Sequence, residues 1–316
     1  MNSHRRYIHP TLLVLFVTIL SSLFSCEESN LEPPFTPSEG INIIVGNRAI
    51  ITSDMIDYYD HSTGLFVFNY DLSSELRHYD ASKFWITDDK VVIFEGATRI
   101  NCPCGVDSTV KTELEAGYYD FTMRLIRSQA NSIYYFSDED ERDNALFINA
   151  LKKQQKYREG LSVNIQEIKR IDYNHIQLSL KITNLDTLNY YIPDPLKMGA
   201  DLHQKLSSGL GLTNRDDYKL TSDSIKIFHQ LTNKAGKTPS LEDGYWDRNW
   251  LSLIESKEDL FMTIDYKQFD SVAPGNYCVS FHFSGLRVDI ANEDLELENG
   301  CLWIGDIGIS EELILQ

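Results

Sequence analysis

The chain has 316 residues, and its 47 acidic and 29 basic side chains give a formal net charge of −18 at pH 7. Hydrophobic residues make up 42% of it and charged residues 24%, so the composition excludes a disordered, a collagen-like and a multi-span membrane protein. An acidic surface repels phosphate backbones, and since the sequence has no extended basic stripe, we expect no nucleic-acid partner. The length suggests about two domains.

The first 25 residues follow the order of a secretory signal. Arg5 and Arg6 precede the apolar run Leu12–Leu20, which is too short for a membrane span of about 20 residues. The sequence Leu-Phe-Ser-Cys then ends at Cys26 and resembles the bacterial lipobox, Leu-x-Ser/Ala/Gly-Cys. This resemblance implies a lipoprotein signal peptide over residues 1–25 and a lipidated Cys26 at the start of the mature chain. An ordinary signal peptide with a chance cysteine, or an uncleaved anchor helix, is the alternative.

Residues 26–40 are expected to hold the lipidated cysteine and a linker. Glu27 and Glu28 directly follow the cysteine, and such an acidic stretch resembles the surface-export signal of Bacteroidota lipoproteins. The alternative is a polar start to a tether. The prolines that follow indicate an extended linker. The resemblance implies a protein held at the outer membrane by its lipid, with exposure at the cell surface as the further expectation.

Residues 41–136 are expected to form an N-terminal domain rich in β-strands. Runs of β-branched and aromatic residues alternate there with Gly, Asn and Asp at turn positions, as is typical of short strands. The expected strands are Ile41–Val45, Gly64–Tyr70, a hairpin of Phe84–Thr87 with Val91–Phe94, and Tyr118–Leu125.

Residues 137–160 are expected to form a helix that connects two β-rich modules. Ser137 stands at the N-cap position, and acids fill the next positions, where negative charge suits the helix dipole. One apolar face has helical spacing: Leu146, Phe147, Ala150 and Leu151. Gly160 is expected to end the helix.

Residues 161–316 are expected to form a C-terminal β-sandwich. Short strands with turn signals between them favour antiparallel sheets, and polar and apolar residues alternate strictly over His175–Asn184. A strand that ends in Thr183-Asn184, and the Pro-Gly-Asn-Tyr segment at 274–277, resemble immunoglobulin-like accessory modules of secreted bacterial proteins. The predicted fold class is mostly β: two β-rich modules joined by one α-helix, the second an immunoglobulin-like antiparallel sandwich.

Four cysteines remain when Cys26 is set aside, an even number in an oxidising compartment. Cys278 and Cys301 both fall on expected strands of the second module, so we predict a disulfide between them. Cys102 and Cys104 form a Cys-Pro-Cys segment that leaves three alternatives open: thiolate ligation of a soft metal, a loop disulfide or unpaired thiols. Two ligands do not make a site, so we expect no bound metal.

Tyr245, Trp246 and Trp250 lie among acidic and amide side chains, a combination that suits a sugar-binding surface. These residues are the candidate ligand site. The alternative is that the two tryptophans, four positions apart, form one face of a short helix packed on the sandwich, and this spacing favours packing.

The sequence lacks the Gly-x-Ser-x-Gly and His-Glu-x-x-His signatures of hydrolases. A P-loop-like segment at Gly236 has Leu231 where the first glycine belongs, so no cofactor is expected. We therefore predict a non-catalytic, lipid-anchored envelope protein that binds a glycan or a protein partner, or serves as a structural component. The alternative is a hydrolase that uses a pair of carboxylates.

Overall fold

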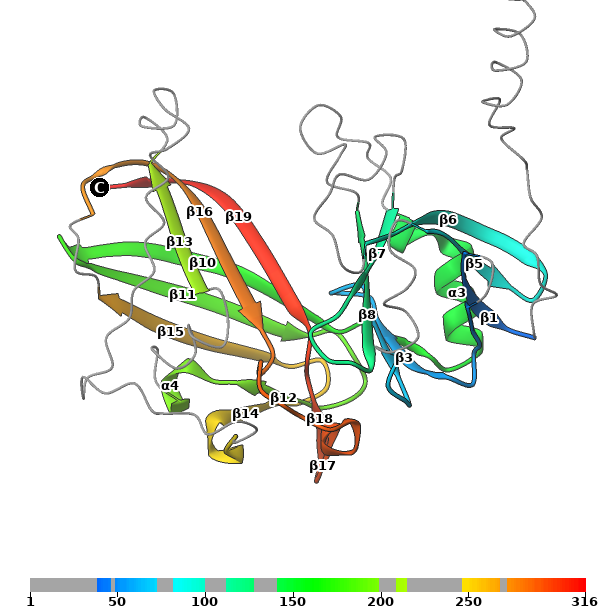
Figure 1. The fold of residues 1–316 in the computed structure, drawn as a ribbon. Coiled ribbons are helices and arrows are strands. Elements are labelled where there is room, and N and C mark those ends of the chain that lie inside the picture. Colours follow the sequence, from blue (N-terminus) through cyan, green and yellow to red (C-terminus); the bar gives the residue numbers. More distant parts are fainter. Residues whose placement is uncertain are drawn as a thin grey trace, which may run out of the picture. The chain divides into compact units, whose positions relative to one another are not determined.

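The computed structural model describes residues 39–46, 49–72, 82–99, 112–127, 141–198, 209–214, 246–267 and 272–316. Contacts divide the chain into residues 1–36 and 37–316, and every described residue belongs to the second unit. This part is mostly β, which confirms the predicted fold class, with strands in four sheets and two short α-helices (Figure 1). No helix among the described residues is long and apolar enough to cross a membrane.

Nine short strands of the N-terminal half pair into one sheet in the order β2-β1-β5-β6-β7-β8-β4-β3-β9. Most pairs are antiparallel, but β6 with β7 and β3 with β9 run parallel. The strands are β1 (Ile41–Val45), β2 (Ala49–Ile51), β3 (Ile56–Asp60), β4 (Leu65–Phe68), β5 (Lys83–Asp88), β6 (Val91–Arg99), β7 (Thr112–Ala116), β8 (Thr122–Arg127) and β9 (Tyr157–Arg158).

One expected strand begins later than predicted. Tyr118 and Tyr119 lie in the connection between β7 and β8, and the second strand begins only at Thr122. The Thr122 hydroxyl donates to the Tyr119 carbonyl at 2.8 Å, and the Gly117 amide donates to the Thr122 carbonyl at 3.0 Å. These bonds hold the two tyrosines in a turn rather than in the ladder.

The helix of this half, α3 (Ala145–Lys153), is shorter than predicted. Its N-cap is Asn144, whose side chain accepts a hydrogen bond from the Leu146 amide at 2.9 Å, whereas the predicted cap, Ser137, lies outside the described residues. Gln155 has a φ of 59°, which stops the helix before Tyr157, a residue of β9. The helix therefore ends ahead of Gly160.

The apolar face of α3 covers the N-terminal sheet (Figure 1), so the helix belongs to this core and does not stand free between two modules. Phe147 is fully buried, and its ring lies 5.1 Å from Tyr59 and 5.4 Å from Phe94. The predicted apolar positions Ala150 and Leu151 are buried beside it, while Leu146 is 65% exposed.

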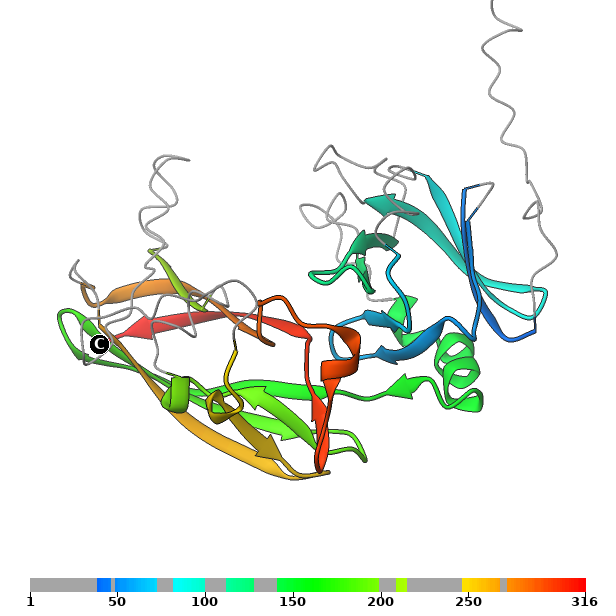
Figure 2. The same cartoon turned by 60° about the horizontal axis from the view of Figure 1, so that its bottom comes forward.

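The C-terminal half contains two antiparallel sheets of three strands around a common core, a sandwich-like arrangement (Figure 2). One sheet has the order β10-β11-β15 and the other β13-β16-β19. Burial alternates along β11 as the sequence pattern predicted, and its buried residues meet those of β16 in one cluster. The strands are β10 (Leu161–Asp172), β11 (His175–Asn184), β13 (Gly209–Asn214), β15 (Asp259–Lys267), β16 (Gly275–Ser284) and β19 (Asp306–Leu315).

A third sheet, made of four short strands, adds to this two-sheet plan. Its order is β14-β12-β18-β17, and β12 and β18 run parallel. The strands are β12 (Tyr190–Pro193), β14 (Leu251–Ile254), β17 (Glu296–Leu297) and β18 (Gly300–Leu302), and the short helix α4 (Pro195–Met198) follows β12. This sheet brings residues of the C-terminal half against the N-terminal sheet, because β18 leads into Trp303.

The two halves share a third buried cluster, in which Tyr58, Val67 and Phe121 pack with residues such as Leu286 and Leu302. Polar contacts accompany the apolar ones. Asp60, 3% exposed, accepts a hydrogen bond from Ser62 Oγ at 2.6 Å and another from Trp303 Nε1 at 3.0 Å. Burial raises the pKa of this carboxyl, and the hydrogen bonds from Ser62 and Trp303 act in the opposite direction. We call this contact region the junction.

Candidate functional site

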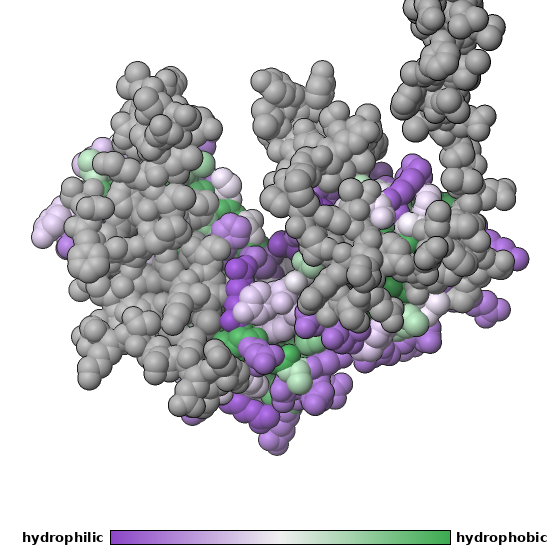
Figure 3. All heavy atoms as spheres, viewed as in Figure 1, coloured by the Kyte–Doolittle hydropathy of each residue, from purple (hydrophilic) through white to green (hydrophobic). Residues whose placement is uncertain are grey.

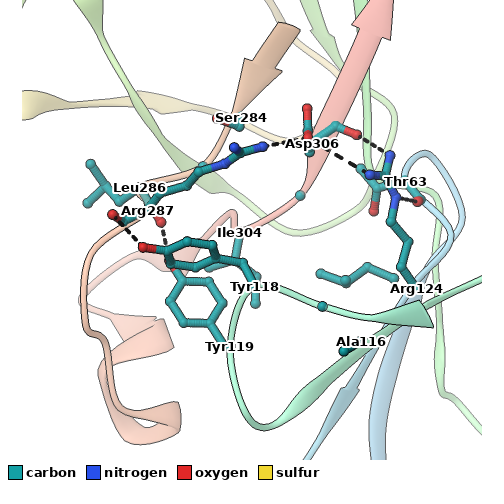
Figure 4. A pocket seen from close by; sticks show the side chains of 14 residues that line it. Thr63, Ala116, Tyr118, Tyr119, Arg124, Ser284, Leu286, Arg287, Ile304 and Asp306 are labelled. Carbon is teal, nitrogen blue, oxygen red and sulfur yellow. Dashed lines mark hydrogen bonds and ion pairs between the residues drawn. The ribbon is translucent and has the colours of Figure 1, made fainter. Parts of the chain in front are cut away.

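A cavity of about 240 Å³ lies at the junction (Figure 4), and we call it the junction cavity. Its lining comes from the start of β4 and the turn before it, from the connection between β7 and β8, from β8, from the end of β16 and the loop after it, and from the segment that leads into β19. The coloured surface in Figure 3 is mainly hydrophilic with smaller hydrophobic areas, as the acidic composition leads one to expect.

Three charged side chains meet in this cavity. Arg287 donates through Nη2 to Asp306 Oδ2 at 2.7 Å. Arg124 donates through Nη2 to the main-chain oxygen of Asp306 at 3.0 Å and through Nε to that of Thr63 at 3.1 Å. The two guanidinium groups thus converge on one aspartate from different parts of the chain (Figure 4).

The strand register explains this convergence. Asp306 is the first residue of β19 and lies opposite Ser284, the last residue of β16, while Arg124 on β8 lies opposite Leu65 on β4. Gly305 lets these segments come together, because a Cβ on it would lie 2.5 Å from Thr63 Cγ2 of the N-terminal half. A larger residue at this position would push the start of β19 away from the N-terminal half.

The electrostatics keep Asp306 ionised. Its burial would raise the pKa, but the neighbouring His282 and the positive charges of Arg287 and Arg124 outweigh burial and hold the pKa below its ordinary value of 3.8. The His282 Nδ1 atom lies 3.5 Å from Asp306 Oδ1. The charged residues of the lining are two arginines and one aspartate, and a further acid outside the lining, Glu115, lies opposite Arg124 on β7.

An aromatic ring forms another part of the lining. Tyr118 is 59% exposed, and its hydroxyl donates to the main-chain oxygen of Arg287 at 2.9 Å. Its ring meets the buried Tyr119 edge to face at 5.0 Å, and Tyr119 in turn stacks on Phe121 at 5.3 Å. The Tyr119 hydroxyl donates to the Leu286 carbonyl. The exposed ring is therefore held by the ring of Tyr119 and at its own hydroxyl.

The aromatic residues that the sequence singled out lie elsewhere. Trp246 and Trp250 are half-buried and pack against the buried cluster that the two halves share at the junction. Trp250 is the last residue of a short 3-10 helix (Arg248–Trp250), and Asp247 caps the start of this helix. This arrangement supports the packing alternative over a sugar-binding surface. Tyr245 and the lipidation candidate Cys26 lie outside the described residues.

The predicted disulfide is wrong, because Cys278 and Cys301 are both free. Cys278 lies on β16 opposite Glu312, with its sulfur 3.7 Å from Ser310 Oγ, whereas Cys301 lies on β18 in a different sheet. Cys102 and Cys104 fall outside the described residues. Within the described ranges no three His, Cys, Asp or Glu side chains come together as a metal site.

Sequence reasoning missed the residues of the junction cavity. Arg124 sits in a segment recognised only as a strand, and Tyr118 was assigned to the same strand. Arg287 and Asp306 belong to no motif. Their hydrogen-bond partners lie between 19 and 182 positions away along the chain, so only the fold brings these side chains together.

Comparison of the chain with protein-family models, with curated proteins and with solved structures found no match. The functional argument therefore depends on the residues of the chain and on the geometry of the junction cavity.

Proposed function

We propose that this protein is a non-catalytic, lipid-anchored protein of the outer membrane that binds a glycan in the junction cavity. The observation that carries the binding part is the exposed ring of Tyr118 beside the donors of Arg124 and Arg287. Carbohydrate sites combine an apolar aromatic face with a few fixed polar groups. The anchoring part depends on the lipobox at Cys26 and on the proline-containing linker that follows it.

A glycan fits this site better than a protein partner does. A stable protein interface buries about 800 Å² on each partner, usually over a flat or gently curved area. The junction cavity is a hollow of about 240 Å³, and its polar groups point at one small volume. An extended sugar chain can insert one residue there while its remaining residues stay in solvent.

The anchor is tested by feeding an alkyne analogue of palmitate to cells that make the full chain. We expect label on the wild-type protein and none on a Cys26→Ser variant, because only the thiol can form the thioether to the lipid. The wild type should sediment with membranes, and several acyl chains at about 0.8 kcal/mol per buried CH₂ would retain it there.

A Cys102→Ser variant serves as the matched control, since it removes a cysteine outside the lipobox and should keep the label. Label that persists in Cys26→Ser would contradict the lipoprotein proposal. Adding a non-permeant protease to intact cells then tests the location: loss of the protein, with periplasmic controls intact, supports exposure at the cell surface.

A hydrolase is the alternative, and one observation favours it. Burial raises the pKa of Glu115 despite the opposing charge of Arg124, while the pKa of Asp306 is lowered, and glycosidases use two carboxyl groups tuned in opposite directions. Against it, Glu115 is not among the residues that line the cavity, and Asp306 Oδ2 is already held by Arg287 at 2.7 Å.

The two functions predict different outcomes in a reducing-sugar assay with the oligosaccharides that the protein binds. We expect no turnover by the wild type, and therefore no difference between wild type and Glu115→Gln. Release of reducing ends that Glu115→Gln abolishes, while Glu113→Gln retains it, would replace the binding proposal with the hydrolase.

A further inference from the structure

We propose that the junction cavity selects a sugar that carries a carboxylate, that is, a uronic acid residue of a glycan. This inference rests on the proposed function, and it adds the chemical class of the ligand. It is carried by the juxtaposition of two guanidinium groups with an exposed aromatic ring in one hollow of limited size.

The two arginines retain donors for a second anion. A guanidinium group has five N–H bonds. Among the described residues, Arg287 donates one hydrogen bond from its side chain, to Asp306, and Arg124 donates two, to main-chain oxygens of Thr63 and Asp306. The unused N–H groups lie on side chains that are 30% and 34% exposed, so they are accessible from the cavity. Guanidinium pairs with carboxylate in a bidentate manner, which fixes orientation as well as charge.

Asp306 holds these donors in place and uses only part of their hydrogen-bonding capacity. A second acid, Glu115, lies opposite Arg124 in the β7–β8 ladder, so a bound anion comes near two acidic side chains. A doubly charged phosphate would be repelled more strongly by these acids than a singly charged carboxylate. The surroundings of the arginines therefore favour a carboxylate over a phosphate as the anionic group.

Tyr118 supplies the contact for the sugar ring. An aromatic face can pack against the C–H face of a pyranose, and this ring is fixed by Tyr119 and by its hydrogen bond to Arg287 before any ligand arrives. The ring of Tyr118 and the side chain of Arg287 line the same cavity (Figure 4). One ligand residue can thus touch Tyr118 with its ring and Arg287 with its carboxylate.

The size of the cavity limits the ligand. Pockets for drug-sized molecules measure roughly 300–1,000 Å³, and this one measures about 240 Å³. It therefore suits one sugar residue and not a long segment of a chain.

Galacturonate and galactose make a matched pair of probes, because they differ only in the group on C6: a carboxylate in the first and a hydroxymethyl in the second. Binding of each to the full chain, purified in a detergent without a sugar headgroup, is measured by calorimetry, with acetate as a probe for the carboxylate alone. We expect galacturonate to bind and galactose to bind at least tenfold more weakly. Arg287→Ala should weaken galacturonate about tenfold or more, since hydrogen bonds to charged groups contribute this much.

The control variant is Arg248→Ala, which removes an exposed arginine outside the cavity and should leave binding unchanged. If Arg287→Ala does not fold, Tyr118 gives an independent test, because its exposed side chain can be changed at little cost to the fold. Tyr118→Phe should retain galacturonate binding, and Tyr118→Ala should weaken galacturonate while leaving acetate unaffected.

Equal binding of galacturonate and galactose would overturn the carboxylate inference and leave the glycan-binding proposal intact. Acetate that binds as tightly as galacturonate would also overturn it, because the ring would then contribute nothing. Absence of binding by both sugars would reject the cavity as a glycan site altogether, while the palmitate label on Cys26 still decides the anchor separately.

Discussion

Trp303→Ala is expected to lower the free energy of unfolding by about 4 kcal/mol, the usual cost of removing a buried aromatic side chain. Trp303 is 1% exposed, its ring stacks on Phe283 at 5.7 Å, and its Nε1 donates to Asp60. The substitution leaves a cavity at the junction and also removes a donor from a buried carboxylate, so the two effects add. Urea unfolding, followed by circular dichroism, measures the change.

Trp246→Ala is the control, because Trp246 is only half-buried, against the cluster shared by the two halves, and should cost less than half as much. The hydrogen bond is isolated by a double-mutant cycle of Trp303→Phe with Asp60→Asn. Since burial raises the pKa of Asp60, its charge is unfavourable there, and we expect Trp303→Phe to cost more beside Asp60 than beside the neutral asparagine. If Trp303→Phe lowers the free energy of unfolding equally with Asp60 and with Asp60→Asn, the hydrogen bond between the two side chains does not stabilise the junction.

Asp306→Ala is expected to destabilise the protein by about 2 kcal/mol at pH 7, because it leaves two partly buried arginines without their shared carboxylate. The side chain is 21% exposed, so solvent screening reduces the effect below that of a fully buried pair. Asp120→Ala, which removes an exposed aspartate at the turn before β8, should change stability by less than 0.5 kcal/mol, as surface substitutions commonly do.

The pH dependence of unfolding gives a second measure of Asp306. Because its folded-state pKa is lowered, the stability it contributes is present above the unfolded-state value, near 3.8, and is lost as the pH falls through the folded-state value. The difference in stability between wild type and Asp306→Ala should therefore be constant near neutral pH and shrink below about pH 4. A difference that stays unchanged down to pH 2 would show that the carboxylate charge is not what stabilises the wild type.

Local patterns predicted the strands well, because alternation is a property of neighbouring residues. His175–Asn184 alternates in sequence and in burial, and Ile41–Val45 became a fully buried strand as its run of β-branched residues indicated. The helix start was misjudged because the acidic stretch after Ser137 imitates a first turn. Asn144, with no acidic residue in the helical turn that follows it, provides the actual cap.

The features that depend on topology were not predictable in the same way. An even number of cysteines favours a disulfide. The number of cysteines gives no information about their positions in the fold, where Cys278 and Cys301 are both free and lie in different sheets. The junction cavity combines Tyr118 and Arg124 with Arg287 and Asp306, and no spacing within one segment links these positions. Trp250 is the opposite case. Its aromatic pattern is apparent in the sequence, but in the fold its side chain packs against the buried cluster at the junction.

The contact between Asp60 and Trp303 joins residues 243 positions apart, and this separation determines when the site can exist. Synthesis proceeds from the N-terminus, so the chain must be made through residue 303 before Asp60 meets its partner. Arg287 and Asp306 belong to the same late stretch of the described residues. A chain cut short before residue 306 keeps Tyr118 and Arg124 but has no complete junction cavity, so ligand binding would also report that synthesis had passed residue 306.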